Sequence, residues 1–333
     1  MNEFSTLLLQ HFDKHGRKLP WRENISPYKI WLSEIMLQQT TVVTVIPYFE
    51  NFLNTFPTVT ALAKADLDDV LHLWQGLGYY SRARNLHKCA GVIVAEHNGA
   101  FPTSEEALLK LPGIGPYTAA AISSIAFNNV STVVDGNVER VISRLYRINT
   151  PLPTAKGEIT VLAKQLNDTQ RPSDYSGAIM DLGATICTPR NPKCHMCPVS
   201  TLCAGLKHGD AASYPKKLPK KKRPEKTGVA YIIQNEHGDI YLERRPETGL
   251  LAKMWQVPNE GWETSEPNTL QHLNIEKPQK IGKIRHVFTH FGLELDVYYA
   301  RSKASSIKGF FPLDALPPTP TLMKKVIAEL QNL

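Results

Sequence analysis

Residues 111–119 read Leu-Pro-Gly-Ile-Gly-Pro-Tyr-Thr-Ala and lie between two segments of helical periodicity. Gly113 and Gly115 permit a tight turn with positive φ and the close approach of a phosphate group. Backbone N–H groups at the start of the following Ala-rich helix are free to bind that phosphate. A bare Gly-x-Gly is often only a helix junction. The whole string is typical of a helix-hairpin-helix, which clamps the DNA backbone without reading its sequence.

Helical periodicity extends on both sides of this hairpin, up to about residue 205. Gly, Pro and Asn residues separate the short apolar-periodic segments. The sequence therefore predicts an all-α domain over residues 1–213. The expected helices include Phe4–His15, Tyr28–Gln38, Leu67–Trp74, Ala83–His97, Glu105–Leu111, Thr118–Phe127 and Val138–Tyr146.

The composition changes at Tyr214–Thr227, where seven basic residues and three prolines cannot form a core. We expect an extended, solvated linker there, and direct DNA contact by its lysines is the less favoured alternative. Beyond it, alternating apolar runs predict strands, so residues 228–333 are expected to form a separate α+β domain. The predicted strands and closing helix are Val229–Ile233, Ile240–Leu242, Leu293–Tyr299 and Leu322–Leu330.

The overall composition narrows the class of protein. The chain has 333 residues, 42% apolar and 21% charged, which excludes wholesale disorder. No apolar run approaches the ~18 residues of a membrane helix, and the N-terminal residues lack the regions of a signal peptide. We therefore expect a cytoplasmic protein, associated with the nucleoid in a bacterium. The net charge of +7 and a pI near 9.0 suit a polyanionic partner.

Four of the five cysteines, Cys187, Cys194, Cys197 and Cys203, fall within seventeen residues. In a long chain this predicts a metal site rather than a disulfide scaffold, and four thiolates suit Zn²⁺ or an iron–sulfur cluster. One Cys-x-x-Cys knuckle with two longer arms favours a [4Fe–4S] cluster. Without flavin or nicotinamide motifs, we expect the cluster to support folding and DNA docking. Cys89 is expected to be a small core residue.

Glu34 lies within the helical segment Tyr28–Gln39. At 100° per residue, Lys29 and Ser33 define the only solvent-facing side, and Glu34 falls on the other side. A carboxyl group desolvated there has a raised pKa and can serve as a general acid. The alternative is a carboxylate hydrogen-bonded by buried partners, and the residues alone leave both interpretations open.

Asp135 stands in Val133–Val138, directly before another predicted helix. The positive end of that helix and its free N–H groups favour an ionised side chain, although such an aspartate is most often only a helix cap. Cleavage of a glycosidic bond needs one protonated and one ionised carboxyl group. Glu34 and Asp135 together therefore predict a site for glycosidic cleavage.

The hairpin, the Val-Asp-Gly-Asn sequence and the four-cysteine loop together resemble the endonuclease III superfamily of DNA glycosylases. Within it, the chain is similar to the MutY-type adenine DNA glycosylases. The resemblance implies excision of adenine mispaired with 8-oxoguanine or guanine in double-stranded DNA, after extrusion of the nucleotide, by a monomer with one [4Fe–4S] cluster. The stretches that carry it are Leu19–Arg22, Trp31–Thr40, Gly76–Tyr80, Met180–Ala184 and His286–Leu293.

The resemblance also implies residue roles. Glu34 would protonate adenine N7, and Asp135 would stabilise the oxocarbenium ion, electrostatically or through a transient covalent bond. Tyr117 and Asn137 would position these groups. Four positions match the adenine pocket and two match residues inserted into the duplex, although without the resemblance core packing is the preferred interpretation of Trp21 and Leu37. These positions are Arg17, Trp21, Leu37 and Val42 in the pocket, and Gln39 and Tyr79 in the duplex.

Three positions depart from the family pattern. Members with lyase activity carry a nucleophilic lysine where this chain has Tyr117, which argues for a monofunctional glycosylase. Some relatives have lysine at the position of Glu139, and we expect little effect of its loss on base excision. Gly177 occupies a pocket position that is often Gln or Glu, so another group, such as a water molecule, must make that contact with adenine.

Residues 228–333 resemble Nudix hydrolases but lack their R-E-x-x-E-E metal box. The glutamates after Pro258 are Glu260, Glu263 and Glu266, which do not have the helical spacing of that box. We interpret the domain as a Nudix-like module that inspects the base opposite adenine without hydrolysing a nucleotide.

Phe288, Thr289 and His290 offer a stacking ring and two hydrogen-bonding side chains at a strand end, suited to 8-oxoguanine. The alternative is a core phenylalanine with two ordinary surface neighbours. Two other function classes remain open: a non-catalytic lesion-binding protein, and a bifunctional pyrimidine glycosylase with lyase activity. The intact pair Glu34 and Asp135 disfavours the first, and Tyr117 disfavours the second.

Overall fold

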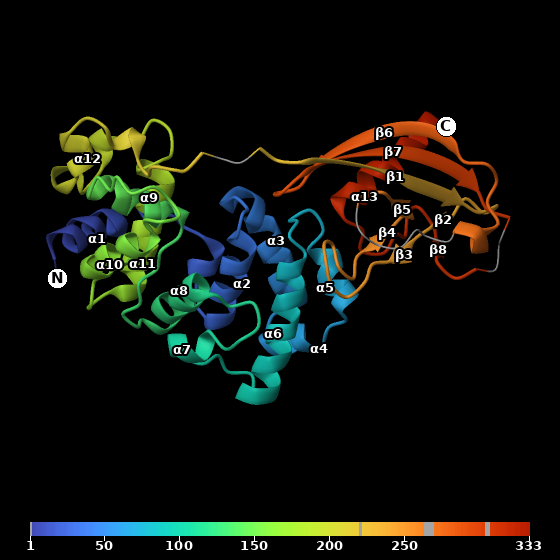
Figure 1. Cartoon of the computed structure of the whole chain (residues 1–333). Coiled ribbons are helices and arrows are strands. Elements are labelled where there is room, and N and C mark those ends of the chain that lie inside the picture. The colour runs from blue at the N-terminus through green and yellow to red at the C-terminus, as the bar shows by residue number, and fades with distance from the viewer. Residues whose placement is uncertain (1, 220–221, 263–269, 304–306) are drawn as a thin grey trace. The chain divides into compact units, whose positions relative to one another are not determined.

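The computed structural model describes residues 2–219, 222–262, 270–303 and 307–333 (Figure 1). Contacts divide the chain into a first unit, Met1–Lys64 with Asn85–Lys220, and a second unit, Ala65–Arg84 with Lys221–Leu333. The later break falls inside the predicted linker. Glu263 and Glu266, two of the glutamates compared with the Nudix metal box, lie outside the described residues.

The ends of the predicted linker are more ordered than an extended tether. Lys217 forms an isolated parallel bridge with Leu152, and Leu152 N donates to Lys216 O at 2.9 Å. At the other end, strand β1 begins at Glu225, before the predicted start of the second domain.

Helices build the described part of the first unit, as predicted. Side-chain caps begin several of them: Asn2 Oδ1 accepts from Ser5 N at 2.8 Å, and Ser26 Oγ accepts from Lys29 N at 3.3 Å. The helices are α1 (Glu3–His15), α2 (Pro27–Leu37), α3 (Val42–Thr55), α4 (Val59–Lys64), α6 (Ser81–His97, which begins in the second unit), α7 (Glu105–Leu108), α8 (Pro116–Phe127), α9 (Gly136–Leu145), α10 (Lys156–Leu166), α11 (Pro172–Asp181) and α12 (Ala204–Lys207). A short 3₁₀ turn, η1 (Pro20–Arg22), precedes α2, and a π-helical turn, η2 (Leu182–Ile186), continues α11.

One apolar core joins α1, α9, α10 and α11. Leu8, Ile142, Ile159 and Ile179 are each at most 2% exposed within it. Their spacing is the helical periodicity that the sequence shows, so burial of these faces holds the four helices together. Cys89 on α6 is fully buried, as expected for a core residue.

Helix α2 is buried on more than one side, because α3 and α8 both pack against it. Glu34 is only 4% exposed, in agreement with the helical phase. The expected solvent-facing position of Ser33 is wrong: Ser33 is fully buried, and its Oγ donates to Ile30 O at 2.9 Å. A serine hydroxyl that bonds to a carbonyl of its own helix is satisfied without water. The polar character of Ser33 therefore did not mark the solvent-exposed side of α2.

The hairpin between α7 and α8 has the expected tight turn at one glycine. Gly113 has φ +76°, and a Cβ there would meet the Cβ of Asn85 at 2.7 Å. The expected positive φ at Gly115 is wrong, because this residue has φ −96° as the N-cap of α8. A Cβ on Gly115 would have no neighbour within 4 Å among the described residues. The start of α8 is therefore open to an approaching phosphate.

The second unit is an α+β domain, and its hairpin, long strand and closing helix confirm the sequence prediction. Strand β1 pairs in parallel with β7 along its whole length, and the other pairs in the sheet are antiparallel. Helix α13 (Thr321–Ala328) packs against β1 and β6 (Figure 1). The order of strands in the sheet is β6 (Gln279–Val287), β7 (Gly292–Arg301), β1 (Glu225–Gln234), β2 (Ile240–Tyr241) and β8 (Phe310–Phe311). Strand β5 (Asn259–Glu260) also pairs with β1. A separate two-stranded sheet consists of β3 (Glu243–Arg244) and β4 (Trp255–Gln256).

A segment from the middle of the helical sequence belongs to this second unit. It contains α5 (Leu67–Leu73) and the first residues of α6. Asp68 forms an ion pair with Arg244 at 2.5 Å, and Arg84 Nη1 donates to Ala252 O at 2.8 Å. Across the described ranges, none of the helices combines the length and hydropathy needed to cross a lipid bilayer.

Candidate active site

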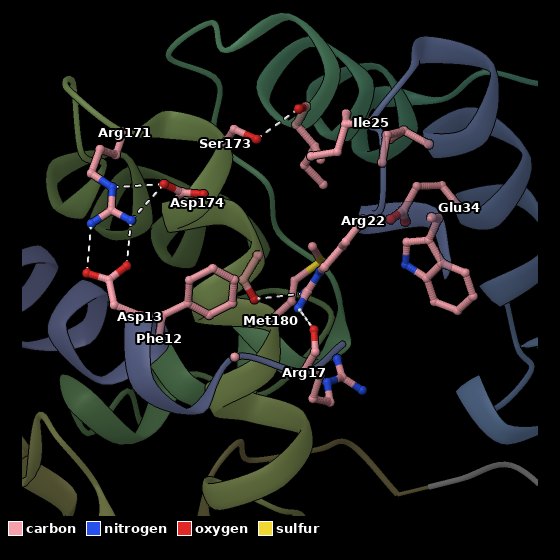
Figure 2. Close-up of a pocket in the computed structure, with 15 residues that line it drawn as sticks. Phe12, Asp13, Arg17, Arg22, Ile25, Glu34, Arg171, Ser173, Asp174 and Met180 are labelled. Atoms are coloured by element: carbon pink, nitrogen blue, oxygen red, sulfur yellow. Dashed lines mark hydrogen bonds and ion pairs between the residues drawn. The ribbon is translucent and has the colours of Figure 1, made fainter. Parts of the chain in front are cut away.

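A cavity of about 340 Å³ opens in the first unit, and Glu34 lies on its wall (Figure 2). Three elements supply part of this wall: η1 supplies Trp21 and Arg22, α2 supplies Glu34, and α11 supplies Gly177 and Met180. The other lining residues are Phe12, Asp13, Gly16, Arg17, Ile25, Ile30, Ile125, Arg171, Ser173 and Asp174.

Glu34 combines burial with a single close partner. Tyr117 Oη on α8 donates to Glu34 Oε2 at 2.5 Å. Burial raises the pKa of Glu34 to about 7, and the charge of Asp135 adds to the rise, whereas the Tyr117 hydrogen bond and the charge of Arg22 oppose it. The pKa of Tyr117 is raised well above its ordinary value by burial and by Glu34, so its hydroxyl remains a donor. Glu34 can therefore hold a transferable proton near neutral pH.

Asp135 lies in the opposite environment, at the N-terminus of α9. Its Oδ1 accepts from Asn137 N at 2.9 Å and from Val138 N at 2.7 Å, and its Oδ2 accepts from Asn137 Nδ2 at 2.6 Å. All three partners are donors, which suits an ionised carboxylate. Asn137 thus bonds to both carboxylate oxygens of Asp135, and its role in the reaction stays a prediction.

Arg140 extends this arrangement to the cysteine loop. Its Nη2 donates to Asn137 Oδ1 at 2.9 Å and to Gly183 O at 2.6 Å, and its Nε donates to Cys187 O at 2.7 Å. Arg140 had no assigned role from the sequence. The available signal was an arginine between the apolar positions of an amphipathic helix, where a buried guanidinium requires several acceptors.

Two arginines share Asp181 beside the cavity. Arg17 Nη2 lies 2.6 Å from Asp181 Oδ1, and Arg22 Nη1 lies 2.9 Å from Oδ2. Burial raises the pKa of Asp181, but the hydrogen bonds from Arg22 and Arg17 outweigh burial and hold this pKa below its ordinary value. The Arg22 guanidinium also lies 5.4 Å from the centroid of the Phe12 ring. Phe12, Arg22 and Asp181 had no assigned role from the sequence.

Some of the other residues expected at this site line the cavity, and others do not. Arg17 and Trp21 line the cavity, whereas Leu37 and Val42 are absent from its wall. Leu37 is the last residue of α2 and Val42 the first of α3, so both lie beyond the part of α2 that faces the cavity. Gln39 is exposed.

Tyr79, in the second unit, is also exposed, and like Gln39 it has a positive φ: 61° for Gln39 and 47° for Tyr79. Both are strained, exposed residues of the kind that a ligand contact can use.

The four clustered cysteines line one small cavity in the first unit, together with Arg144 and Ile186. Arg144 Nη1 donates to Cys187 Sγ at 3.3 Å and to Thr188 O at 2.7 Å, and its Nε donates to Tyr214 O at 3.1 Å. Within the described ranges, no three His, Cys, Asp or Glu side chains are grouped as ligands of a single metal ion. The four cysteines share one cavity, and four thiolates are a ligand set of iron–sulfur clusters.

In the second unit, Phe288, Thr289 and His290 follow strand β6 and line a cavity of about 370 Å³. Phe288 is half-buried and stacks on Trp262, with ring centroids 6.0 Å apart and an interplanar angle of 12°. Thr289 and His290 are exposed, and Thr289 Oγ1 lies 2.9 Å from Tyr79 Oη within the same unit. Phe288 therefore packs at the edge of the core, while its two neighbours present polar groups.

Comparison with proteins of known function agrees with this geometry. The chain is 39% identical over 298 residues to an adenine DNA glycosylase of Buchnera aphidicola from Schizaphis graminum, covering 88% of this chain and 86% of that protein. The chain belongs to the adenine DNA glycosylase family. An adenine DNA glycosylase of Homo sapiens is 34% identical over 382 residues, covering 95% of this chain and 69% of that protein.

Family models divide this adenine DNA glycosylase family member into three parts. Residues 32–165 match the HhH-GPD superfamily of base excision DNA repair proteins, residues 187–203 the iron–sulfur binding domain of endonuclease III, and residues 229–329 a NUDIX domain. The chain is therefore a DNA-binding hydrolase of N-glycosyl bonds in base excision repair, with an iron–sulfur site. The predicted family, fold class and enzyme class are confirmed.

Solved structures show the same helical fold. A thermostable thymine-DNA glycosylase is 30% identical with a TM-score of 0.57, covering 62% of this chain and 95% of that chain. An endonuclease III in a non-covalent complex with DNA is 23% identical with a TM-score of 0.52, covering 62% of this chain and 94% of that chain. The second similarity concerns the fold alone.

Proposed function

We propose that this adenine DNA glycosylase family member removes adenine mispaired with 8-oxoguanine, or with guanine, as a monomeric and monofunctional hydrolase. The observation that carries the proposal is the pair of carboxyl groups in opposite environments: Glu34, with a pKa near 7, and Asp135, held by three donors. The same proposal locates the enzyme with chromosomal DNA, in the cytoplasm and, in a bacterium, at the nucleoid.

The reaction follows from these two environments. Glu34 donates its proton to adenine N7 as the bond between N9 and C1′ breaks, and Asp135 stabilises the oxocarbenium ion that forms. Tyr117 holds Glu34 by its hydroxyl hydrogen bond at 2.5 Å. No lysine is among the residues that line the cavity in the described chain, which supports hydrolysis without a Schiff base.

The second unit supplies the proposed recognition of the opposite base. Thr289 and His290 are exposed on a turn after β6 and offer hydrogen-bonding groups to a purine edge, beside Phe288. In this proposal, residues 1–213 cleave, residues 214–227 connect, and residues 228–333 select the opposite base.

The cysteine loop is proposed to hold one [4Fe–4S] cluster through Cys187, Cys194, Cys197 and Cys203. The shared cavity of the four sulfur atoms and the donation from Arg144 to Cys187 Sγ support this ligand set. When bound, the cluster would supply a rigid centre for the loop. Iron and sulfide analysis of the purified protein should give four of each per chain, and one zinc ion per chain would contradict the assignment.

The test of function is single-turnover strand cleavage after alkali, with adenine placed opposite 8-oxoguanine, guanine, cytosine or thymine. We expect excision opposite the first two only, and no covalent adduct after borohydride treatment. Thr289→Ala combined with His290→Ala should reduce the preference for 8-oxoguanine over guanine. His237→Ala, which changes another exposed histidine on a turn of the same unit, is the matched control. An adduct with borohydride, or an unchanged preference, would contradict the corresponding part of the proposal.

A further inference from the structure

Most charged groups around the Glu34 cavity are paired with one another. Arg17, Trp21, Arg22 and Arg171 carry N–H donors, and Asp13, Glu34, Ser173 and Asp174 carry acceptors. Among the lining residues in the described chain there is no asparagine, glutamine or histidine. The carboxylates at the rim are committed: Arg171 Nη2 lies 2.6 Å from Asp13 Oδ1 and 2.8 Å from Asp174 Oδ2. Glu34 is therefore the one carboxyl group of this wall that no arginine pairs with.

Arg22 is fixed in an orientation that leaves one donor for a ligand. Its Nη1 donates to Arg17 O at 3.1 Å and Asp181 Oδ2 at 2.9 Å, and its Nη2 donates to Gly177 O at 3.3 Å and Asp181 Oδ1 at 2.9 Å. Within the described chain, its Nε has no hydrogen-bond partner. A guanidinium has five N–H donors in a rigid plane, so one N–H of Arg22, a residue of the cavity wall, remains without a partner among the described residues.

The absence of a side chain at position 177 makes this arrangement possible. A Cβ on Gly177 would lie 3.2 Å from Phe12 Cζ and 3.4 Å from Arg22 Nη2. Phe12 and Arg22 are thus the side chains nearest to the position of that Cβ. The wall at this point presents a donor and an aromatic ring, with no side-chain acceptor.

The amino group at position 6 of adenine is a hydrogen-bond donor and needs an acceptor to be recognised. A site built to bond such a group rejects an analogue without it by about 10⁴–10⁵-fold, because the buried partner would be left unpaired. This cavity has no uncommitted carboxylate or amide for that purpose other than Glu34, which the reaction uses as the acid. The Ser173 hydroxyl also lines the cavity and donates to Ile125 O at 2.8 Å. A hydroxyl can both donate and accept, so it does not distinguish an amino group from a carbonyl oxygen. The side chains of the cavity wall therefore do not make the amino group a requirement.

We propose that Arg22 recognises an acceptor on the purine, and that the pocket also accepts purines without the 6-amino group, including hypoxanthine, the deamination product of adenine. This inference rests on the proposed glycosylase function of the same site. The reaction is the same hydrolysis: the bond between N9 and C1′ breaks, and the Glu34 proton passes to N7. The water oxygen bonds to C1′, and a water proton returns to Glu34.

The direct test compares single-turnover excision of adenine, hypoxanthine and unsubstituted purine, each opposite 8-oxoguanine in the same duplex. Each rate is divided by the rate of acid depurination of the free deoxynucleoside. We expect both analogues within about thirtyfold of adenine, far less than the rejection by a site that binds the amino group. A slower excision of either analogue overturns the inference. If adenine itself is not removed, the proposed function fails instead.

A second arm restores an acceptor. Phe12→Leu makes room, and Gly177→Gln then adds an amide carbonyl, so the double variant should raise the adenine-to-hypoxanthine ratio at least tenfold. Phe12→Leu with Gly177→Ala, which adds only a Cβ, is the matched control. Ratios cancel a general loss of folded protein. An equal ratio in the two double variants overturns the inference, and if the glutamine variant does not fold, the wild-type comparison decides alone.

Discussion

The two carboxyl groups of the site belong to one residue class, yet the chain places them in contrasting surroundings. Glu34 lies on a helix packed on several sides and has one hydrogen-bond donor, Tyr117. Asp135 lies at a helix N-terminus and receives three donors, two of them backbone N–H groups. Burial raises the pKa of Glu34, and three donors around Asp135 suit an ionised carboxylate, so the two surroundings fit the proposed roles of an acid and of a stabiliser of positive charge.

The largest effect on excision is expected from a substitution of Glu34. Glu34→Gln keeps the side-chain volume but removes the proton donor, so adenine excision should fall by about 10²–10⁴-fold, the usual contribution of general acid catalysis. Single-turnover kinetics and duplex binding should be measured on the same preparation. Nearly wild-type binding with lost excision supports the assignment, and excision within a factor of two of wild type would refute it.

The second test is at Asp135. Asp135→Asn keeps a cap for α9 but removes the negative charge that faces the oxocarbenium ion. We expect a loss of about 10²–10³-fold in the rate of excision, comparable to the loss of one electrostatic stabiliser in other active sites. Thr58→Ala, which removes a side-chain cap at the start of α4, controls for the loss of stability. If both variants lose activity to the same extent, Asp135 is only a cap.

The burial of Glu34 also predicts a dependence of stability on pH. The pKa of Glu34 is about 7 in the folded protein against 4.5 as its ordinary value, so the folded state holds the proton more tightly. Its contribution is fully present below pH 4.5 and is lost as pH rises to 7, by about 3 kcal/mol. At pH 8, Glu34→Gln should therefore unfold at a higher temperature than wild type. An unchanged or lower melting temperature at that pH would contradict the raised pKa.

Gly183 tests the support of Asp135 rather than the carboxylate itself. A Cβ on Gly183 would meet Asn137 Cβ at 2.6 Å and Asn137 O at 3.0 Å. Gly183→Ala should displace Asn137 and reduce excision by about 10–10²-fold, because small misplacements at a reacting centre are costly. Gly157→Ala on α10, where a Cβ has no neighbour within 4 Å in the described chain, is the matched control and should remain near wild type.

The smallest effect is expected at the partner of Glu34. The Tyr117 hydrogen bond lowers the pKa of Glu34, so Tyr117→Phe should raise that pKa further. The alkaline fall of excision, which follows loss of the Glu34 proton, should then move to higher pH by about one unit, with a rate at pH 6 within tenfold of wild type. A shift to lower pH would reverse the proposed role of the hydroxyl.

Sequence periodicity predicted much of this site because local phase decides which side of a helix is buried. It correctly predicted that Glu34 is buried and that Asp135 precedes a helix. It wrongly predicted that Ser33 is exposed, because the Ser33 hydroxyl bonds within its own helix. Arg140 and Asp181 were missed for another reason. Their partners lie far away along the chain, such as Cys187 for Arg140 and Arg22 for Asp181, and no local pattern encodes such contacts.

The membership of Ala65–Arg84 in the second unit has a consequence for synthesis of the chain. The ribosome releases this segment long before Lys221–Leu333, the rest of the unit to which it belongs. Until then, residues such as Asp68 and Arg84 lack their later partners, Arg244 and the carbonyl of Ala252. During synthesis, Ala65–Arg84 can therefore complete its native contacts only after the C-terminal residues have been made. A fragment that ends at the linker contains this segment without the residues against which it packs.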